Sequence, residues 1–238
     1  ILADGSFGSH TAGLFEPYED QPENYGLLYH DDNHWKNFIL KAHEADLQIA
    51  VHCIGDRAIS QVLKYYSEAQ ENDPKDLRHI LIHNELTSDA MISSMAYSNV
   101  VAAMQPMFDR LWAGKGGLYE RVLGVKRTEN TTRLRTLLDN GVIIGGGSDW
   151  YVTEMDALSG IDAATRIHNP AERLTAYEAV ELYTCNAAYI SHDEDRIGQL
   201  SEGYQADFVV LAENPLESEE IRNIEILEVY KSGKKVSK

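Results

Sequence analysis

The sequence of 238 residues has little cysteine, few basic residues and no long apolar run, and each shortage excludes a class of protein. Its two cysteines, Cys53 and Cys185, have no paired spacing, which excludes a disulfide framework and a Cys-x-x-Cys zinc knuckle and fits a reducing compartment. Lys and Arg number 21 against 38 Asp and Glu, and the net charge of -17 would repel nucleic acid and anionic lipid. No apolar run reaches the roughly 18 residues needed to span a bilayer. We therefore expect a cytoplasmic protein with a small-molecule substrate, no nucleic-acid partner and no membrane contact, and the sequence leaves homo-oligomer formation open.

The amino end also lacks familiar features. The run Ile1-Leu2-Ala3-Asp4-Gly5 has neither an initiator Met nor the basic-then-apolar layout of a signal peptide. It is typical of the end of a buried strand. We therefore expect the chain to begin in mid-domain, and a signal peptide upstream of it stays open.

What the sequence does contain is a repeat of short apolar strands and amphipathic helices. The helical stretches carry apolar residues with a period near 3.6, and the strands between them are apolar throughout, as in a buried parallel sheet. Asp56 is the expected N-cap of the second helix, Thr87 or Ser88 that of the third, and Thr175 with Glu178 predicts a capping box. Helices are predicted at 33–47, 57–69, 88–96, 132–140, 157–167 and 176–188, and strands at 49–52, 79–83, 100–105 and 142–147.

Two parts of the chain depart from this repeat. Residues 106–130 form a stretch longer than an ordinary strand-to-helix loop, with several glycines beside Trp112 and Tyr119, and we expect a lid there. Towards the carboxyl end the period changes from 3.6 to 2, which predicts antiparallel strands. The fold class is thus α/β, with residues 1–197 as part of a parallel TIM-like barrel and residues 198–238 as an antiparallel β segment.

Polar residues stand at the ends of successive predicted strands. His52, His83, Gln105 and Asp149 follow one another at the ends of units of about thirty residues, a length that suits βα repeats. In a parallel barrel such positions converge on one rim. Two neutral imidazoles and a carboxylate suit zinc or a similar divalent ion, which would lower the pKa of a bound water to about 7 and supply hydroxide. Asp149 would serve both as a ligand of the ion or its water and as the group that carries a proton to the leaving atom.

Other polar residues near these strand ends have two interpretations each. Gln105 could contact substrate or satisfy a loop. Asp4 could line the site, or simply turn the chain at an Asp-Gly step. Trp150, directly after Asp149, is a further candidate for substrate contact. Asp56 and Arg57 are expected to be structural.

A set of motifs along nearly the whole chain resembles the amidohydrolase superfamily, and the closing Gly-x-x-Ala-Asp pattern is specific. The resemblance is nearest to its branch of imidase- and deformylase-like metal hydrolases that includes N-substituted formamide deformylase. The motifs are Val51-His52-x-x-Gly55-Asp56-Arg57-Ala58, Arg78-His79 with His83, Met104-Gln105-Pro106, Gly147-Ser148-Asp149, Thr184-x-Asn186-Ala187-Ala188 and Gly198-x-Leu200-x-x-Gly203-x-x-Ala206-Asp207-Phe208-Val209-Val210-Leu211.

The resemblance implies a distorted (β/α)8 barrel, a small β-sandwich, and one or two metal ions. It implies that His52 and His83 are metal ligands from the fifth and sixth strands, that Asp149 is the acid/base of the eighth, and that the reaction is hydrolysis of a non-peptide C–N bond of amide or formamide type. It also implies a lysine, often carbamylated to bridge two metals, just upstream of Ile1. The amino-terminal half of the family pattern, with its first-strand His-x-His, has no counterpart here, so we expect a fragment or a chain divided at the modified lysine.

Two alternatives to the amidohydrolase hypothesis stay open. A barrel that has lost its metal could use the pocket to sense a small molecule, and Ile82, where the family usually has Glu, fits that alternative. A related metal hydrolase could instead act on esters or phosphoesters.

Overall fold

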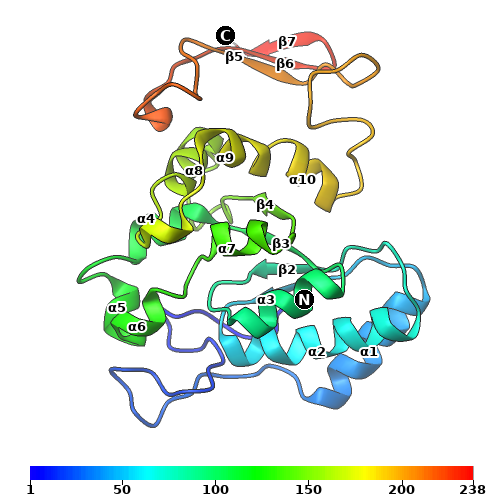
Figure 1. The fold of residues 1–238 in the computed structure, drawn as a ribbon, viewed down its shortest axis with the longest axis vertical. Helices are drawn as coiled ribbons and strands as arrows, with labels where there is room; N and C mark the ends of the chain where they lie inside the picture. The colour runs from blue at the N-terminus through cyan, green and yellow to red at the C-terminus, as the bar shows by residue number, and fades with distance from the viewer. Residues whose placement is uncertain (238) are drawn as a thin grey trace.

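The computed structural model describes residues 1–237, and a parallel sheet forms its centre (Figure 1). The strands β1 (Ala50–Cys53), β2 (Ile80–His83), β3 (Val101–Met104) and β4 (Ile144–Gly146) lie side by side in chain order. Leu2 forms a parallel bridge with His52, so the amino end extends the sheet beside β1. Because all these strands are parallel, their carboxyl ends share one edge. The sheet is open within residues 1–237, so the fold prediction is confirmed as a parallel α/β sheet but not as a closed barrel.

Helices cover the sheet as the apolar periodicity predicts. The stripe expected on the second helix is buried in the main core, including Ile59, Val62 and Tyr66, which have no exposed surface. Capping also follows the sequence: Ser88 caps α3, and Thr175 forms the predicted capping box with Glu178. The helices around the sheet are α1 (Asp32–Glu44), α2 (Asp56–Asn72), α3 (Asp89–Tyr97), α7 (Leu134–Asp139), α8 (Ala157–Ala164), α9 (Ala176–Leu182) and α10 (Cys185–Ile190), with a 3-10 turn at Pro170–Glu172.

The N-cap prediction for α2 is wrong by one residue. Gly55 is the N-cap, and Asp56 is the first helical residue, whose Oδ1 accepts from the N–H groups of Phe15 (3.0 Å) and Arg57 (2.9 Å). A Cβ on Gly55 would lie 2.2 Å from the carbonyl oxygen of Gly13. The close approach of the amino-terminal loop therefore requires glycine at the cap position. The same loop donates one backbone hydrogen bond, from Phe15, to the side chain of Asp56.

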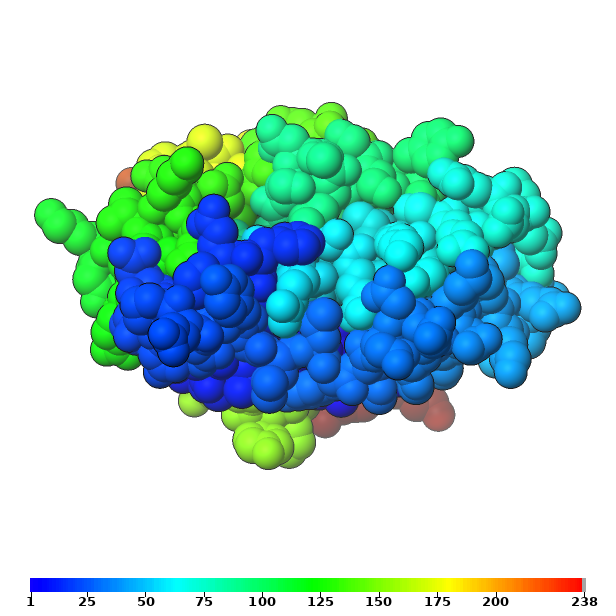
Figure 2. Space-filling view, turned by 90° about the horizontal axis from the view of Figure 1, so that it is seen from below, coloured from blue at the N-terminus to red at the C-terminus, as the bar shows by residue number. Residues whose placement is uncertain are grey.

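The stretch predicted as a lid contains three short helices, α4 (Pro106–Trp112), α5 (Leu118–Leu123) and α6 (Val125–Thr128). They pack against the amino-terminal segment, and the two share a second apolar cluster that contains Phe7, Leu14 and Tyr18 on one side and Tyr119 and Val122 on the other. The N–H of Glu19 donates to the carbonyl oxygen of Val122 at 2.8 Å. Figure 2 shows this contact on the surface, where the blue amino-terminal segment lies against green residues.

The predicted antiparallel strands are present near the carboxyl end. The strands β5 (Phe208–Leu211), β6 (Ile226–Lys231) and β7 (Lys234–Ser237) form one sheet at the top of Figure 1. A 3-10 turn at Ile221–Asn223 lies between β5 and β6 in the chain. Residues 1–237 provide this single layer and not the second layer of a sandwich. No helix in the same range is both long and apolar enough to cross a membrane.

A buried histidine pair beside the sheet gives the fold a predicted pH dependence. His79 is 4% exposed, and its Nδ1 accepts the N–H of Ile49 at 3.2 Å. Its Nε2 lies 2.9 Å from Nδ1 of His43. The Nε2 of His43 in turn lies 2.7 Å from the carbonyl oxygen of Asp73. Burial, and then the neighbouring His43, lower the pKa of His79 from 6.5 to about 4. The unfolded chain therefore binds a proton more readily, and stability that is present above pH 6.5 is lost as the pH falls through about 4.

We expect the free energy of unfolding to fall by about 3 kcal/mol between pH 7 and pH 4 through this histidine. Urea unfolding of the wild type and of His79→Gln at a series of pH values would measure it. The variant should be less stable at pH 7 but should show a flatter pH dependence. An equal pH dependence in both proteins would contradict this origin.

Candidate active site

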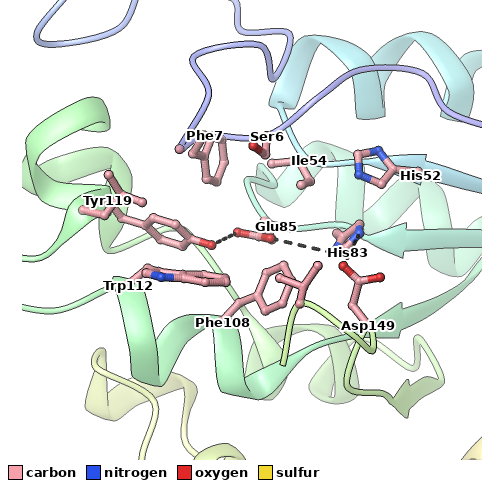
Figure 3. A pocket seen from close by; sticks show the side chains of 13 residues that line it. Ser6, Phe7, His52, Ile54, His83, Glu85, Phe108, Trp112, Tyr119 and Asp149 are labelled. Atoms are coloured by element: carbon pink, nitrogen blue, oxygen red, sulfur yellow. Dashed lines mark hydrogen bonds and ion pairs between the residues drawn. The ribbon is translucent and has the colours of Figure 1, made fainter. Parts of the chain in front are cut away.

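Three of the side chains predicted to converge lie on one wall of a cavity at the shared strand edge (Figure 3). His52 comes from β1, His83 ends β2 and Asp149 follows β4. The imidazole centroids of His52 and His83 are 4.5 Å apart, and Nε2 of His83 lies 4.0 Å from Oδ2 of Asp149. The cavity has a volume of about 460 Å³, which is in the range of small-molecule sites.

The electrostatics of His83 suit metal binding. His83 is 2% exposed, and its burial, together with the charge of His52, lowers its pKa to about 3. The imidazole is therefore neutral at physiological pH, which is the form that binds a metal ion. The Nδ1 atoms of His52 and His83 are both buried and have no hydrogen-bond partner.

The backbone at this edge is unusual. His83, Asn84 and Asp149 have φ angles of 69°, 50° and 52°, in the left-handed region that residues other than glycine seldom adopt. Such conformations cost about 1–3 kcal/mol each and cluster at functional sites. They turn the chain sharply after β2 and β4 and hold the side chains at the cavity.

Asp4 is not among the described lining residues of the cavity, and its hydrogen bonds give it a structural role, one of its two interpretations from sequence. Its side chain is fully buried. Oδ1 accepts the N–H of Ile54 (3.0 Å), and Oδ2 accepts the N–H groups of Gly13 (2.9 Å) and Gly55 (2.8 Å). These three bonds fix the turn that follows His52, so Asp4 supports the site from below the cavity.

Gln105 and Trp150 also lie outside the described lining of the cavity. Gln105 is 8% exposed, and its Nε2 donates to the carbonyl oxygen of Ala103 at 3.3 Å, but its buried Oε1 has no hydrogen-bond partner and its side chain interacts with His83. Trp150 is 65% exposed and points to the surface, because the chain leaves the strand edge at Asp149. Val152, from the same loop, lines the cavity instead.

Sequence reasoning missed a buried carboxyl in the cavity. Glu85 is 3% exposed, and its Oε2 accepts the hydroxyl of Tyr119 at 2.6 Å. Burial, opposed in part by this bond, raises the pKa of Glu85 to about 8. The sequence signal that could have identified Glu85 is its place two positions after His83, a predicted metal ligand.

The cavity has an aromatic wall, of which the sequence indicated only Trp112 and Tyr119, as part of the stretch expected to form a lid. Phe108 and Trp112 come from α4 and Tyr119 from α5, while Phe7 comes from the amino-terminal loop. The rings meet edge to face, with centroids 4.6 Å apart for Phe108 and Trp112 and 5.1 Å apart for Phe7 and Tyr119. None of the described lining residues is Lys or Arg.

The donors present fit part of a divalent metal site. Two imidazoles with unpartnered ring nitrogens and a nearby carboxylate are the ligand types that zinc prefers. Residues 1–237 nevertheless contain no group of three His, Cys, Asp or Glu side chains spaced to hold an ion. A complete coordination shell would therefore need small movements or further ligands.

The chain is similar in sequence and in fold to known proteins. The YtcJ amidohydrolase of Bacillus subtilis (strain 168) is 35% identical over 98% of this chain and 45% of its own length. N-substituted formamide deformylase of Arthrobacter pascens is 23% identical over 87% of this chain and 40% of its own length. The crystal structure of an uncharacterized metal-dependent hydrolase from Pyrococcus furiosus superposes with a TM-score of 0.80 and 30% identity, over 91% of this chain and 44% of that one.

The chain thus spans less than half the length of each of these proteins. The model of the amidohydrolase family matches residues 1–237. The predicted resemblance is therefore confirmed, and this protein belongs to the amidohydrolase family.

Proposed function

We propose that this protein is a metal-dependent hydrolase of a non-peptide C–N bond in a small-molecule amide. The observation that carries the proposal is the meeting of His52, His83 and Asp149, from three separate strand ends, on one wall of a cavity. Family membership and a metal-dependent hydrolase among the similar structures support it. The name of the deformylase relative supports an amide or formamide bond. Residues 1–197 would carry this site and residues 198–238 the β segment.

The residues have distinct roles in this proposal. His52 and His83 would hold the ion, which we propose to be zinc, one or two in number, through ring nitrogens, with remaining ligands from outside residues 1–237. When bound, the ion would acidify a water and polarise the amide carbonyl. Asp149 would take a proton from the attacking water and deliver it to the leaving nitrogen. Its carboxylate is half-exposed at the cavity. For proton transfer it needs only to reach the water and the leaving nitrogen in a suitable orientation.

The cavity wall indicates the kind of amide. Aromatic and aliphatic side chains form most of the wall, and the lining includes two carboxyl groups, Glu85 and Asp149, but neither Lys nor Arg. An anionic substituent would be repelled and would lose its hydration there. We propose that the amide carries an uncharged apolar group that packs against Phe108 and Trp112.

A metal-free sensor is the second candidate. The lack of a three-ligand cluster within residues 1–237 favours it. Such a protein would bind an apolar small molecule in the same cavity without hydrolysing it. Metal analysis separates the two functions.

We expect the intact purified protein to contain about one or two equivalents of zinc, and we expect His52→Ala and His83→Ala to lose most of it, because each variant removes an imidazole donor. Elemental analysis by mass spectrometry measures the metal directly. The control is His34→Ala, which removes an exposed histidine of α1 and should leave the metal content unchanged.

Hydrolysis assays on amides, formamides, esters and phosphoesters would then assign the bond. Metal-free wild type that binds a small apolar ligand tightly would favour the sensor. Turnover of the esters or phosphoesters alone would replace the C–N assignment.

A further inference from the structure

The buried carboxyl of Glu85 is held in a fixed position between Tyr119 and His83 (Figure 3). The Tyr119 hydroxyl, itself on a side chain that is 3% exposed, donates to Oε2 at 2.6 Å. Oε1 is turned towards His83, at 3.9 Å from its Nδ1. The tyrosine bond therefore leaves one carboxyl oxygen for a second donor.

Two unsatisfied buried atoms face each other across this gap. Oε1 of Glu85 and Nδ1 of His83 both lack a hydrogen-bond partner within residues 1–237. Buried polar atoms without a partner are costly, and a movement of about 1 Å would bring this pair to hydrogen-bond distance. The amide oxygen of Gln105 is also buried without a partner, and the Gln105 side chain interacts with His83, so Glu85 and Gln105 are the two candidate acceptors for Nδ1–H of His83.

The consequence concerns the tautomer of His83. An imidazole that donates Nδ1–H to a carboxylate has its lone pair on Nε2, and this pairing also fixes the ring orientation. Nε2 is the His83 atom on the side of Asp149, at 4.0 Å from its Oδ2. Donation from Nδ1 thus presents the Nε2 lone pair where an ion or a proton donor would meet it.

We propose that Glu85, held by Tyr119, is a positioning residue that accepts Nδ1–H of His83 and so directs the Nε2 lone pair towards Asp149. The use of this tautomer rests on the proposed function, since a metal ligand needs the lone pair. The tautomer itself can be measured in the metal-free protein. Neither Glu85 nor Tyr119 has to touch substrate or the reacting atoms for this role.

Nitrogen-15 NMR of histidine-labelled, metal-free intact protein tests the proposal. Comparison with His83→Asn assigns the ring signals. We expect Nδ1–H in the wild type and in Glu85→Gln, whose amide oxygen can still accept. Glu85→Leu should lose this preference, and its zinc affinity should fall by about 10–100-fold.

Tyr119→Phe should weaken the preference, because the carboxyl is then free to turn. Glu71→Leu, which changes an exposed residue of α2, is the matched control and should behave as wild type. A wild-type His83 protonated at Nε2, or a Glu85→Leu protein with unchanged tautomer and zinc affinity, would overturn the proposal. If the tautomer is as expected and no amide is hydrolysed, only the proposed function fails.

Discussion

Replacing Asp149 with asparagine is expected to lower kcat by about a thousandfold on any amide that the wild type hydrolyses. Asparagine keeps the shape and one carbonyl oxygen of the aspartate, but it can neither take a proton from water nor deliver one to the leaving nitrogen. The side chain is 40% exposed and stands 4.0 Å from His83, so the substitution should leave the packed core intact. Steady-state kinetics, with metal content measured on the same samples, separate lost proton transfer from lost metal.

Asp195→Asn provides the matched control, since it makes the same chemical change at an exposed aspartate outside the described cavity lining. It should retain wild-type kcat. A kcat within about threefold of wild type for Asp149→Asn would remove Asp149 from the proton path, even if His52 and His83 are shown to bind metal.

The largest effect on stability is expected at Asp4. Alanine at this position would leave the N–H groups of Gly13, Ile54 and Gly55 without their acceptor in a fully buried place. We expect Asp4→Ala to lower the free energy of unfolding by about 3–5 kcal/mol, since the bonds to a charged acceptor are lost and the donors stay buried. Chemical denaturation monitored by circular dichroism would measure this change.

Asp4→Asn should be less destabilising than Asp4→Ala, because the amide oxygen can still accept a hydrogen bond. It should still be less stable than the wild type, because the amide nitrogen would face a backbone N–H that needs an acceptor. Asp195→Ala, at an exposed position, should change stability little. If Asp4→Ala unfolds at the same denaturant concentration as the wild type, the three bonds contribute nothing to folding. The expected loss also bears on function, because the turn held by Asp4 follows His52 directly.

The strand edge was predictable from sequence because the relevant signals are local. Apolar runs that end in His52 and His83, each preceded by an amphipathic helix, give the parallel strands, and parallel strands bring their carboxyl ends together. The capping residues Ser88 and Thr175 were likewise readable, since a cap depends on a few neighbouring residues.

The rest of the site could not be predicted because it depends on contacts between distant segments. Glu85 is a buried carboxyl of the cavity, and it is held there by Tyr119, 34 positions later, whose hydroxyl donates to it. The stretch around Trp112 has the glycines of a mobile loop, yet it packs with the amino-terminal segment as part of a second core. Asp4 has the local pattern of a simple turn, and its buried role follows only from residues 13, 54 and 55.

The left-handed backbone at His83, Asn84 and Asp149 has a consequence for engineering this protein. A glycine at Asn84 would relieve one unfavourable conformation and remove no side-chain hydrogen bond seen in the structure, since both polar atoms of that side chain lack partners within residues 1–237. Selection for heat resistance should therefore accept glycine at Asn84, whereas His83 and Asp149, whose side chains face the cavity, should be kept.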